Sequence, residues 1–458
     1  MSPCATDGAS YDESTVRATA VAAVLALCVS CTPVATPPPS PSSATTAPVA
    51  TSPASTGLVG LDRRPDAVAI QGRRWYTVPD GLQQERARVA VSMPGEAAPG
   101  QPRARLRSTQ ETVPLAFVAA PSAGPQWSAS VGLEGVPPGE QTVEFLVRMK
   151  DGTDVVVATT TFMLSAPVYL VWTLDFEGDA VTDEMLSNTF AINRTYFVPL
   201  TLLWNPRVWT TTQIPKERAD AMRQWAMSVT SATSGEIGLH LHAWTDFVRS
   251  AGVTPRTSPS WAGRSDGYDV PLTAFDEAET KRLLDHALKL MADNGMPKPT
   301  SFRGGGLFAN AANLRAVAAS GFTVDTSATP SGDFGLLTYP WTLLPGAQPY
   351  RPSRTDANVA GDLPLIEVPN IAGNTYGHTT FTIQRIINDD LAMLPAVGAP
   401  ALQKRAMTLV SHPSTIDATE RAAIEKLFQA FEPYRWDRDK GPLRYVTLSQ
   451  LAKAYSGP

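Results

Sequence analysis

The clearest hydrophobic pattern in the chain is an apolar segment from Val168 to Leu174, in which Thr173 is the one polar residue. A short apolar run without polar alternation predicts a β-strand that is buried on both faces. The run ends in two carboxylates, Asp175 and Glu177, which are separated by one residue. Because an isolated buried charge is costly, paired carboxylates at a strand end indicate a metal ion, a basic partner or a catalytic task.

From residue 167 onward, apolar runs of strand length alternate with segments of helical period. Two segments carry apolar residues at helical spacing, namely 276–292 and 418–432. Thr273 lies three residues before Asp276, a spacing similar to that of a capping box. This alternation predicts either a parallel α/β barrel or an open parallel α/β sheet. In both folds the catalytic groups gather at the carboxyl ends of the strands.

The preceding segment, residues 66–165, has a different pattern. It contains short runs of β-forming residues separated by turn residues, and no helical period is evident. The runs 141–149 and 155–164 are joined through Asp151-Gly152, which is a strong hairpin signal. We expect an all-β sandwich of immunoglobulin-like size. The segment contains no histidine and no carboxylate cluster, so we expect it to act as a spacer or binding domain.

Residues 1–31 have the pattern of an export signal. An apolar run from 18 to 30 follows Arg17 and is too short to span a bilayer comfortably. The run ends at Val29-Ser30-Cys31, which resembles the bacterial lipobox whose cysteine is lipidated after cleavage; a simple secretory signal is the alternative. Residues 32–65 are rich in Pro, Ser and Thr and predict an extended linker. The expected location is extracytoplasmic in a bacterium, with a lipid anchor to the membrane or full secretion.

Cysteine content and charge bear on disulfides, cysteine metal sites and nucleic-acid binding. The three cysteines, Cys4, Cys28 and Cys31, lie in or before the expected signal, so the mature chain would have no internal disulfide and no cysteine metal site. The net charge is −5 and becomes −3 once residues 1–30 are removed. Such a small charge does not indicate nucleic-acid binding.

The five histidines all lie beyond residue 166, and two of them share a predicted strand end. His240 and His242 are two positions apart, so their side chains project to the same face of the strand. Two imidazoles there could hold one metal ion, or they could be a half-buried pair hydrogen-bonded to the backbone. The presence of Asp175 and Glu177 at the same predicted edge favours the metal.

Two further side chains complete the predicted cluster. His412 follows another apolar run; it is either structural or, if a metal site exists, a candidate acid. Arg303 opens a run of three glycines, where it could hold a carboxylate or lie exposed in a loop. His286 is expected on the polar face of its helix, and His378 lies in a polar loop that could line a groove.

Taken in order, these motifs resemble those of the polysaccharide deacetylases, the NodB-homology family. In that family an apolar strand ends in paired acids, a Glu-Ile-Gly stem precedes metal-binding histidines, an arginine lies in a Pro/Gly turn, and a Leu-x-x-His motif closes the site. The matching positions here are Asp175-Phe176-Glu177, Glu236-Ile237-Gly238 with His240, Arg303, and Leu409 with His412.

The resemblance implies a role for each matched residue. Asp175 would be the base, Glu177 a metal ligand, Arg303 the group that orients the base, and His412 the acid. His240 would be a second metal ligand.

The sequence also departs from the family pattern. The family usually has a second histidine four residues after the first, and this chain has Trp244 at that position. His242 would then take the place of the second histidine as a metal ligand. Glycines replace the prolines of the arginine motif, and Asp325 is the nearest candidate for the family's fourth motif.

The resemblance covers roughly residues 167–455, within a domain expected over 166–458. It implies an incomplete parallel (β/α) barrel, a divalent metal with zinc as the expected ion, and removal of acetyl groups from an N-acetylated cell-wall or extracellular polysaccharide. One alternative is a metal-free carbohydrate- or wall-binding lipoprotein, which Trp244 favours. Another is an amide hydrolase of the same fold that acts on small molecules.

Overall fold

The computed structural model describes residues 60–83, 85–93, 101–120 and 124–456. The predicted signal, Cys31 and most of the predicted linker lie outside the described residues. The described residues belong to one compact unit. In the described part of the chain, no helix combines the length and the apolar character needed to cross a bilayer.

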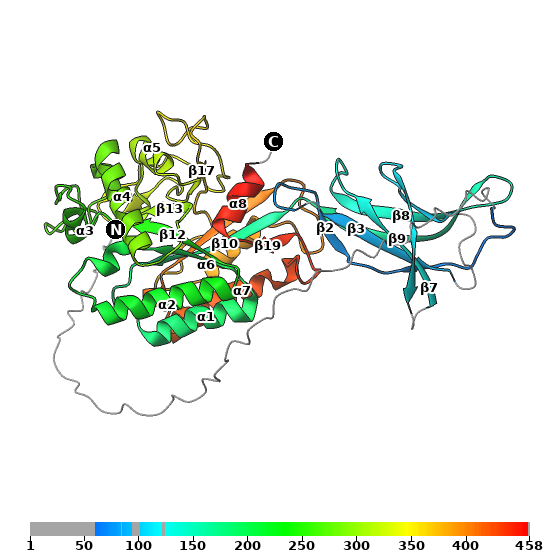
Figure 1. Cartoon of the computed structure of the whole chain (residues 1–458), viewed down its shortest axis with the longest axis horizontal. Helices are drawn as coiled ribbons and strands as arrows, with labels where there is room; N and C mark the ends of the chain where they lie inside the picture. Colours follow the sequence, from blue (N-terminus) through cyan, green and yellow to red (C-terminus); the bar gives the residue numbers. More distant parts are fainter. Residues whose placement is uncertain (1–59, 84, 94–100, 121–123, 457–458) are drawn as a thin grey trace, which may run out of the picture. The chain divides into compact units, whose positions relative to one another are not determined.

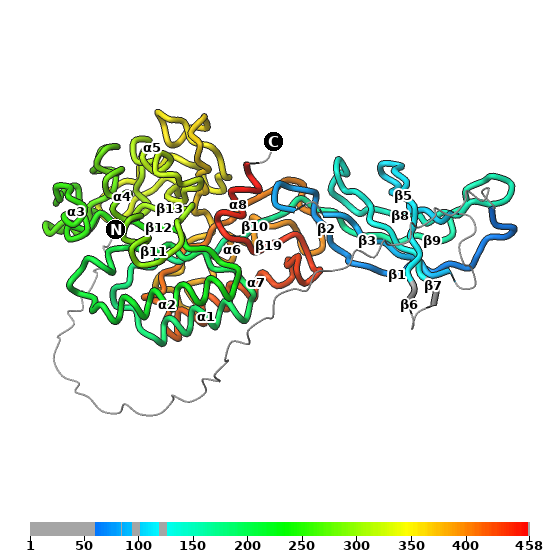
Figure 2. Tube along the Cα trace, viewed as in Figure 1, coloured from blue at the N-terminus to red at the C-terminus, as the bar shows by residue number. Residues whose placement is uncertain are grey.

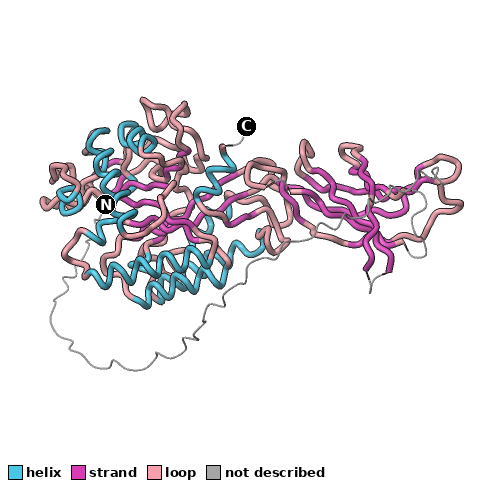
Figure 3. Tube along the Cα trace, viewed as in Figure 1, coloured by secondary structure: helices cyan, strands magenta, loops and turns pink. Residues whose placement is uncertain are grey.

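The first part of this unit consists of strands and loops (Figure 3). Its strands are β1 (Val68–Ile70), β2 (Trp75–Thr77), β3 (Arg86–Ser92), β4 (Arg103–Leu106), β5 (Thr112–Pro114), β6 (Ala116–Ala120), β7 (Gly124–Gly132), β8 (Gly139–Arg148) and β9 (Asp154–Ser165). They form two sheets, with orders β1-β3-β7-β6 and β2-β9-β8-β4-β5, around one shared hydrophobic core. β8 and β9 form the antiparallel hairpin expected across Asp151-Gly152. The immunoglobulin-like character and the domain boundaries stay predictions.

The second part is built on a parallel sheet. Its strands are β10 (Val168–Phe176), β11 (Leu200–Trp204), β12 (Glu236–Leu241), β13 (Ser301–Gly304), β14 (Val324–Asp325), β17 (Ile366–Glu367), β18 (Arg405–Ser411) and β19 (Leu443–Tyr445). The strands follow the order β17-β14-β13-β12-β11-β10-β18, and β19 pairs with the start of β10. Figure 2 labels β13, β12, β11, β10 and β19 of this sheet. In the described chain the two end strands do not pair, so the barrel stays open and the predicted incomplete (β/α) barrel is confirmed.

Helices cover this sheet. They are α1 (Asp183–Tyr196), α2 (Lys216–Ala232), α3 (Thr245–Ser250), α4 (Glu277–Asp293), α5 (Ala311–Ala319), α6 (Gln384–Ala392), α7 (Ala418–Phe431) and α8 (Leu448–Tyr455). Figure 1 shows α1, α2 and α7 together along one face. The predicted helical segments match α4 and α7, but the capping box of α4 uses Asp276 and Glu279 rather than Thr273. The Asp276 side chain accepts from the Glu279 backbone, which leaves no capping role for Thr273.

Two irregular excursions interrupt the regular alternation near the carboxyl edge of the sheet. One spans residues 251–271, and the other leads from β14 to β17 and contains the short hairpin β15 (Asp333–Phe334) and β16 (Leu337–Thr338). The backbone N–H of Leu336 donates to the carbonyl of Trp261 at 2.7 Å, which joins the two excursions. They therefore form one wall beside the strand ends.

Candidate active site

All six predicted site residues lie at the carboxyl edge of the parallel sheet. Asp175 lies in β10, His240 in β12 and Arg303 in β13. Glu177, His242 and His412 follow the ends of β10, β12 and β18 within a residue. Because neighbouring strands run parallel, their ends meet at one edge, and the structure brings all six side chains together there.

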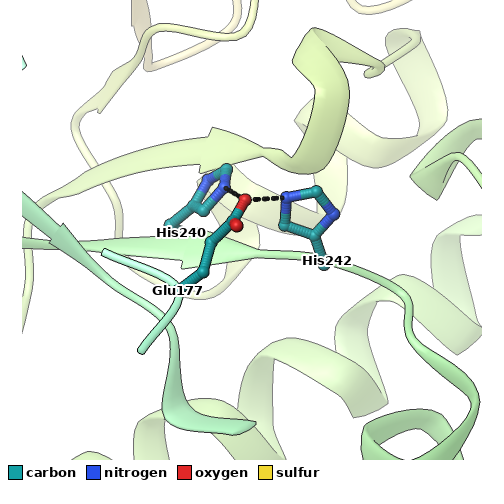
Figure 4. Close-up of side chains that lie close together, drawn as sticks. All are labelled: Glu177, His240 and His242. Atoms are coloured by element: carbon teal, nitrogen blue, oxygen red, sulfur yellow. Dashed lines mark ion pairs between the residues drawn. The ribbon is translucent and has the colours of Figure 1, made fainter. Parts of the chain in front are cut away.

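The close group that resembles a metal centre consists of Glu177, His240 and His242 (Figure 4). Oε1 of Glu177 lies 2.9 Å from Nε2 of His242 and 3.7 Å from Nε2 of His240. Burial disfavours the ionised Glu177, but the His242 and His240 rings outweigh it and hold the pKa of this carboxyl well below its usual range. The Glu177 side chain keeps 23% exposure, so solvent can reach the group.

The donor atoms fit a divalent metal ion. Nδ1 of His240 lies 3.2 Å from the carbonyl oxygen of Arg303, so Nδ1 carries the proton and Nε2 offers a lone pair. Nε2 of His240 is buried and, among the described residues, has no hydrogen-bond partner. Two imidazole nitrogens and one carboxylate oxygen make a donor set that suits a zinc-type ion with an open position.

Metal binding at this group would displace a proton. Burial lowers the pKa of His240, but the Asp175 and Glu177 carboxylates outweigh it, so the pKa of this imidazole is raised overall in the metal-free chain. A histidine must be neutral to bind a metal ion, and metal affinity should therefore fall as the solution becomes more acidic.

Asp175 and Arg303 form a buried ion pair. Nη1 of Arg303 donates to Oδ1 of Asp175 at 2.6 Å, and Arg303 is fully buried. The remaining guanidinium donors contact Thr326 and Asn370, so the plane of the guanidinium group is fixed. Burial opposes ionisation of Asp175, but Arg303, His240 and His412 outweigh it and lower its pKa. The alternative of an exposed arginine in a loop is therefore wrong.

His412 lies beside the same carboxylate. Its Nε2 is 3.8 Å from Oδ2 of Asp175, and the Tyr376 ring meets the imidazole edge-on at 5.4 Å. Burial lowers the pKa of His412, while the carboxylates of Asp175 and Glu177 oppose that shift. A lowered pKa makes the imidazolium a stronger acid, which suits proton donation to a leaving group.

These side chains open into a cavity of about 350 Å³. One wall is aromatic and comes from the two excursions, with Trp261, Phe334 and Tyr339. Asn374 and Tyr376 lie among the other lining residues. The sequence pattern does not single out these aromatic side chains, because their loops carry no periodic signal, although the loop around His378 was expected to line a groove.

The other histidines and Asp325 lie elsewhere. His286 contacts Ser250, and His378 contacts Thr382. His378 belongs to the same loop as Asn374 and Tyr376, which line the cavity. Asp325 is buried, accepts from Ser327 and does not line the cavity. None of these side chains joins the metal-like group in the described structure.

No protein-family profile matches the sequence, and no curated protein is significantly similar to it. Among solved structures, a provisionally assigned polysaccharide deacetylase from Mycobacterium smegmatis aligns over 63% of this chain and 89% of its own, at 16% identity and a TM-score of 0.41. A family 4 carbohydrate esterase from Streptomyces lividans, solved with acetate, aligns over 57% of this chain and 87% of its own, at 11% identity and a TM-score of 0.30. A family 4 acetyl xylan esterase from Clostridium thermocellum, solved with cobalt, aligns over 63% and 93%, at 10% identity and a TM-score of 0.32. None of these TM-scores reaches 0.5, so the function proposed below depends on the geometry of the site.

Proposed function

We propose that this protein is a metal-dependent hydrolase that removes acetyl groups from an N-acetylated cell-wall or extracellular polysaccharide. The observation that carries the proposal is the juxtaposition of two units at one strand edge. The Asp175–Arg303 ion pair is buried, and the Glu177–His240–His242 group lies within 3.8 Å of it through the contact between His240 and Asp175. An ionised base beside a metal-ligand set is what hydrolysis of an unactivated amide requires.

Each of the six residues would have its own task in the reaction. Glu177, His240 and His242 would hold a divalent metal ion, for which zinc is the expected identity. When bound, such an ion polarises a carbonyl oxygen and lowers the pKa of water. Asp175 would accept the proton of the attacking water, because its lowered pKa keeps it ionised. Arg303 would orient Asp175, and His412 would protonate the departing amine.

The aromatic wall of the cavity favours a substrate that contains sugar rings. Trp261 stacks on Phe308 at 5.8 Å and meets Phe334 edge-on, so the wall is a rigid aromatic surface. Aromatic faces pack well against the apolar faces of sugar rings while the sugar hydroxyls keep their polar partners. The Tyr376 ring, which is 62% exposed, adds a second aromatic group beside His412.

The experiment is elemental analysis of the purified protein together with acetate release from chitin oligomers and peptidoglycan. We expect about one equivalent of divalent metal and acetate release that a chelator abolishes. Asp175→Asn should keep the metal while turnover falls by roughly 10²–10⁴-fold, the usual contribution of a general base. A metal-free protein that binds these polymers would overturn the proposal in favour of a binding lipoprotein. Activity confined to small cyclic amides would instead indicate an amide hydrolase of the same fold.

We also propose that the chain is exported and anchored through Cys31. The proposal depends on the Val29-Ser30-Cys31 sequence and the apolar run before it. Cys31→Ser should move the protein from the membrane fraction to the soluble fraction, as an immunoblot of fractionated cells would show. Wild-type protein found free in the medium would contradict the anchor and leave a simple secretory signal.

A further inference from the structure

The two candidate histidine ligands are oriented in different ways. Nδ1 of His240 is hydrogen-bonded to the Arg303 carbonyl, as is usual for a metal-ligating histidine. Nδ1 of His242 is buried and has no hydrogen-bond partner within the described part of the chain. Nε2 of His242 faces Glu177 at 2.9 Å, so any restraint on the Nδ1 side of the ring must come from packing.

Packing on the His242 ring provides that restraint. The indole of Trp244 stacks on the imidazole with ring centroids 4.4 Å apart and planes inclined by 16°. The backbone of Gly305 also approaches closely, because a Cβ at that position would lie 2.5 Å from Nδ1 of His242. The ring is thus confined by an aromatic face and by a residue without a side chain.

Trp244 is itself held in place by Arg207. The guanidinium carbon of Arg207 lies 4.6 Å from the centroid of the Trp244 ring, a cation–π distance. Arg207 is buried, and Asp179 and Asp246 bind it at 2.7 and 2.8 Å. These contacts leave Arg207 little freedom to move. Arg207 therefore limits the movement of the Trp244 indole, which packs on His242.

We propose that Trp244, supported by Arg207, is a positioning residue that holds His242 as a metal ligand. This inference rests on the proposed metal-dependent function and extends it. The indole restrains the orientation of the His242 ring, as the hydrogen bond to the Arg303 carbonyl does for His240. Trp244 therefore compensates, through stacking, for the histidine that the deacetylase pattern has at its position.

The test compares Zn²⁺ affinity among full-length variants, measured by competition with a chromophoric chelator. Trp244→Ala and Trp244→Leu should weaken Zn²⁺ binding by about 10- to 100-fold, the range typical for loss of an orienting partner. Trp244→Phe keeps a stacking ring and should stay within about 3-fold of wild type. Trp127→Ala removes an indole of similar burial from the separate core of the all-β part, and it should leave Zn²⁺ affinity unchanged.

A double-mutant comparison separates positioning from general structural support. In a His242→Ala background, Trp244→Ala should not weaken the residual Zn²⁺ affinity further, because the ligand that it positions is already gone. An equal loss in both backgrounds would overturn the inference, as would a Trp244→Phe variant as weak as Trp244→Leu. If Trp244→Ala does not fold, the Leu and Phe variants decide the question. Wild-type protein that binds no Zn²⁺ would defeat the proposed function and this inference together, whereas tight binding unaffected by Trp244→Leu defeats only the inference.

Discussion

Arg303 donates from Nη1 to Oδ1 of Asp175 at 2.6 Å, and both side chains are buried at the carboxyl edge of the sheet. The pair joins β13 to β10, although β12 and β11 lie between these strands in the sheet. Arg303 is thus the main source of positive charge that keeps Asp175 ionised in a buried position. The charge state of the proposed base should therefore depend more on Arg303 than on His240 or His412.

Replacing the guanidinium should change the pH dependence of turnover. Arg303→Gln removes the charge that lowers the Asp175 pKa, so that pKa should rise and the acidic limb of the kcat/KM profile should move to higher pH. Turnover near neutral pH should fall by at least ~10-fold. Arg303→Lys keeps the charge and should shift the limb less. The exposed pair Arg354–Asp362 offers a control, and Arg354→Gln should leave the profile unchanged. An unmoved acidic limb in Arg303→Gln would show that Asp175 is not the base.

Gly305 should be essential for the proposed metal centre. In Gly305→Ala the new Cβ would lie 2.5 Å from Nδ1 of His242, so the imidazole must shift from its present position beside Glu177. We expect Zn²⁺ affinity to fall by about 10-fold or more. Gly332→Ala is the matched control, because a Cβ there meets no atom within 4 Å. Equal affinity in the two variants, measured by chelator competition, would argue against His242 as a ligand.

The aromatic wall should affect substrate binding more than chemistry. Phe334→Ala removes a ring that lines the cavity without touching the proposed catalytic residues. We expect KM for acetylated oligosaccharides to rise by roughly 2- to 10-fold, the equivalent of one aromatic contact, with little change in kcat. Phe381 is 86% exposed and does not line the cavity, so Phe381→Ala is a control that should leave both constants unchanged. A fall in kcat alone would assign Phe334 a different role.

Asp390 should make stability depend on pH. Burial, with a smaller contribution from Asp389, raises the pKa of Asp390 to about 8, and neither of its carboxyl oxygens has a partner among the described residues. The folded state therefore binds more protons than the unfolded state, whose pKa is ~3.9. The free energy of unfolding should fall as pH rises from ~4 towards about 8, by about 1.4 kcal/mol per pH unit from this group.

Urea unfolding at pH ~5, ~6 and ~7 would measure the effect of Asp390. The Asp390→Asn variant has no ionisable group at this position. Its free energy of unfolding should therefore rise relative to that of wild type at each higher pH. The exposed neighbour gives a matched control, and Asp389→Asn should stay close to the wild-type slope. Parallel curves for wild type and Asp390→Asn would mean that the buried carboxyl does not titrate as expected.

The sequence by itself determined the fold class and the six candidate positions. Short apolar runs such as 168–174 favour buried strands when helical segments alternate with them, and parallel strands bring their carboxyl ends to one edge. His240 and His242 could be paired because alternate residues of a strand share a face. The boundaries of α4 and α7 agree with the predicted segments within one residue, although Asp276 rather than Thr273 caps α4.

Only the tertiary structure decided how these residues are held. Arg303 could be read from the sequence as exposed or buried, because nothing local reveals that Thr326 and Asn370 surround its guanidinium. Trp244 looked like a missing ligand, whereas stacking makes it the neighbour that confines His242. The aromatic wall arises from two irregular excursions joined by backbone hydrogen bonding between Leu336 and Trp261. Such contacts link residues far apart in the chain, and no periodic pattern encodes them, because they depend on how separate loops pack together.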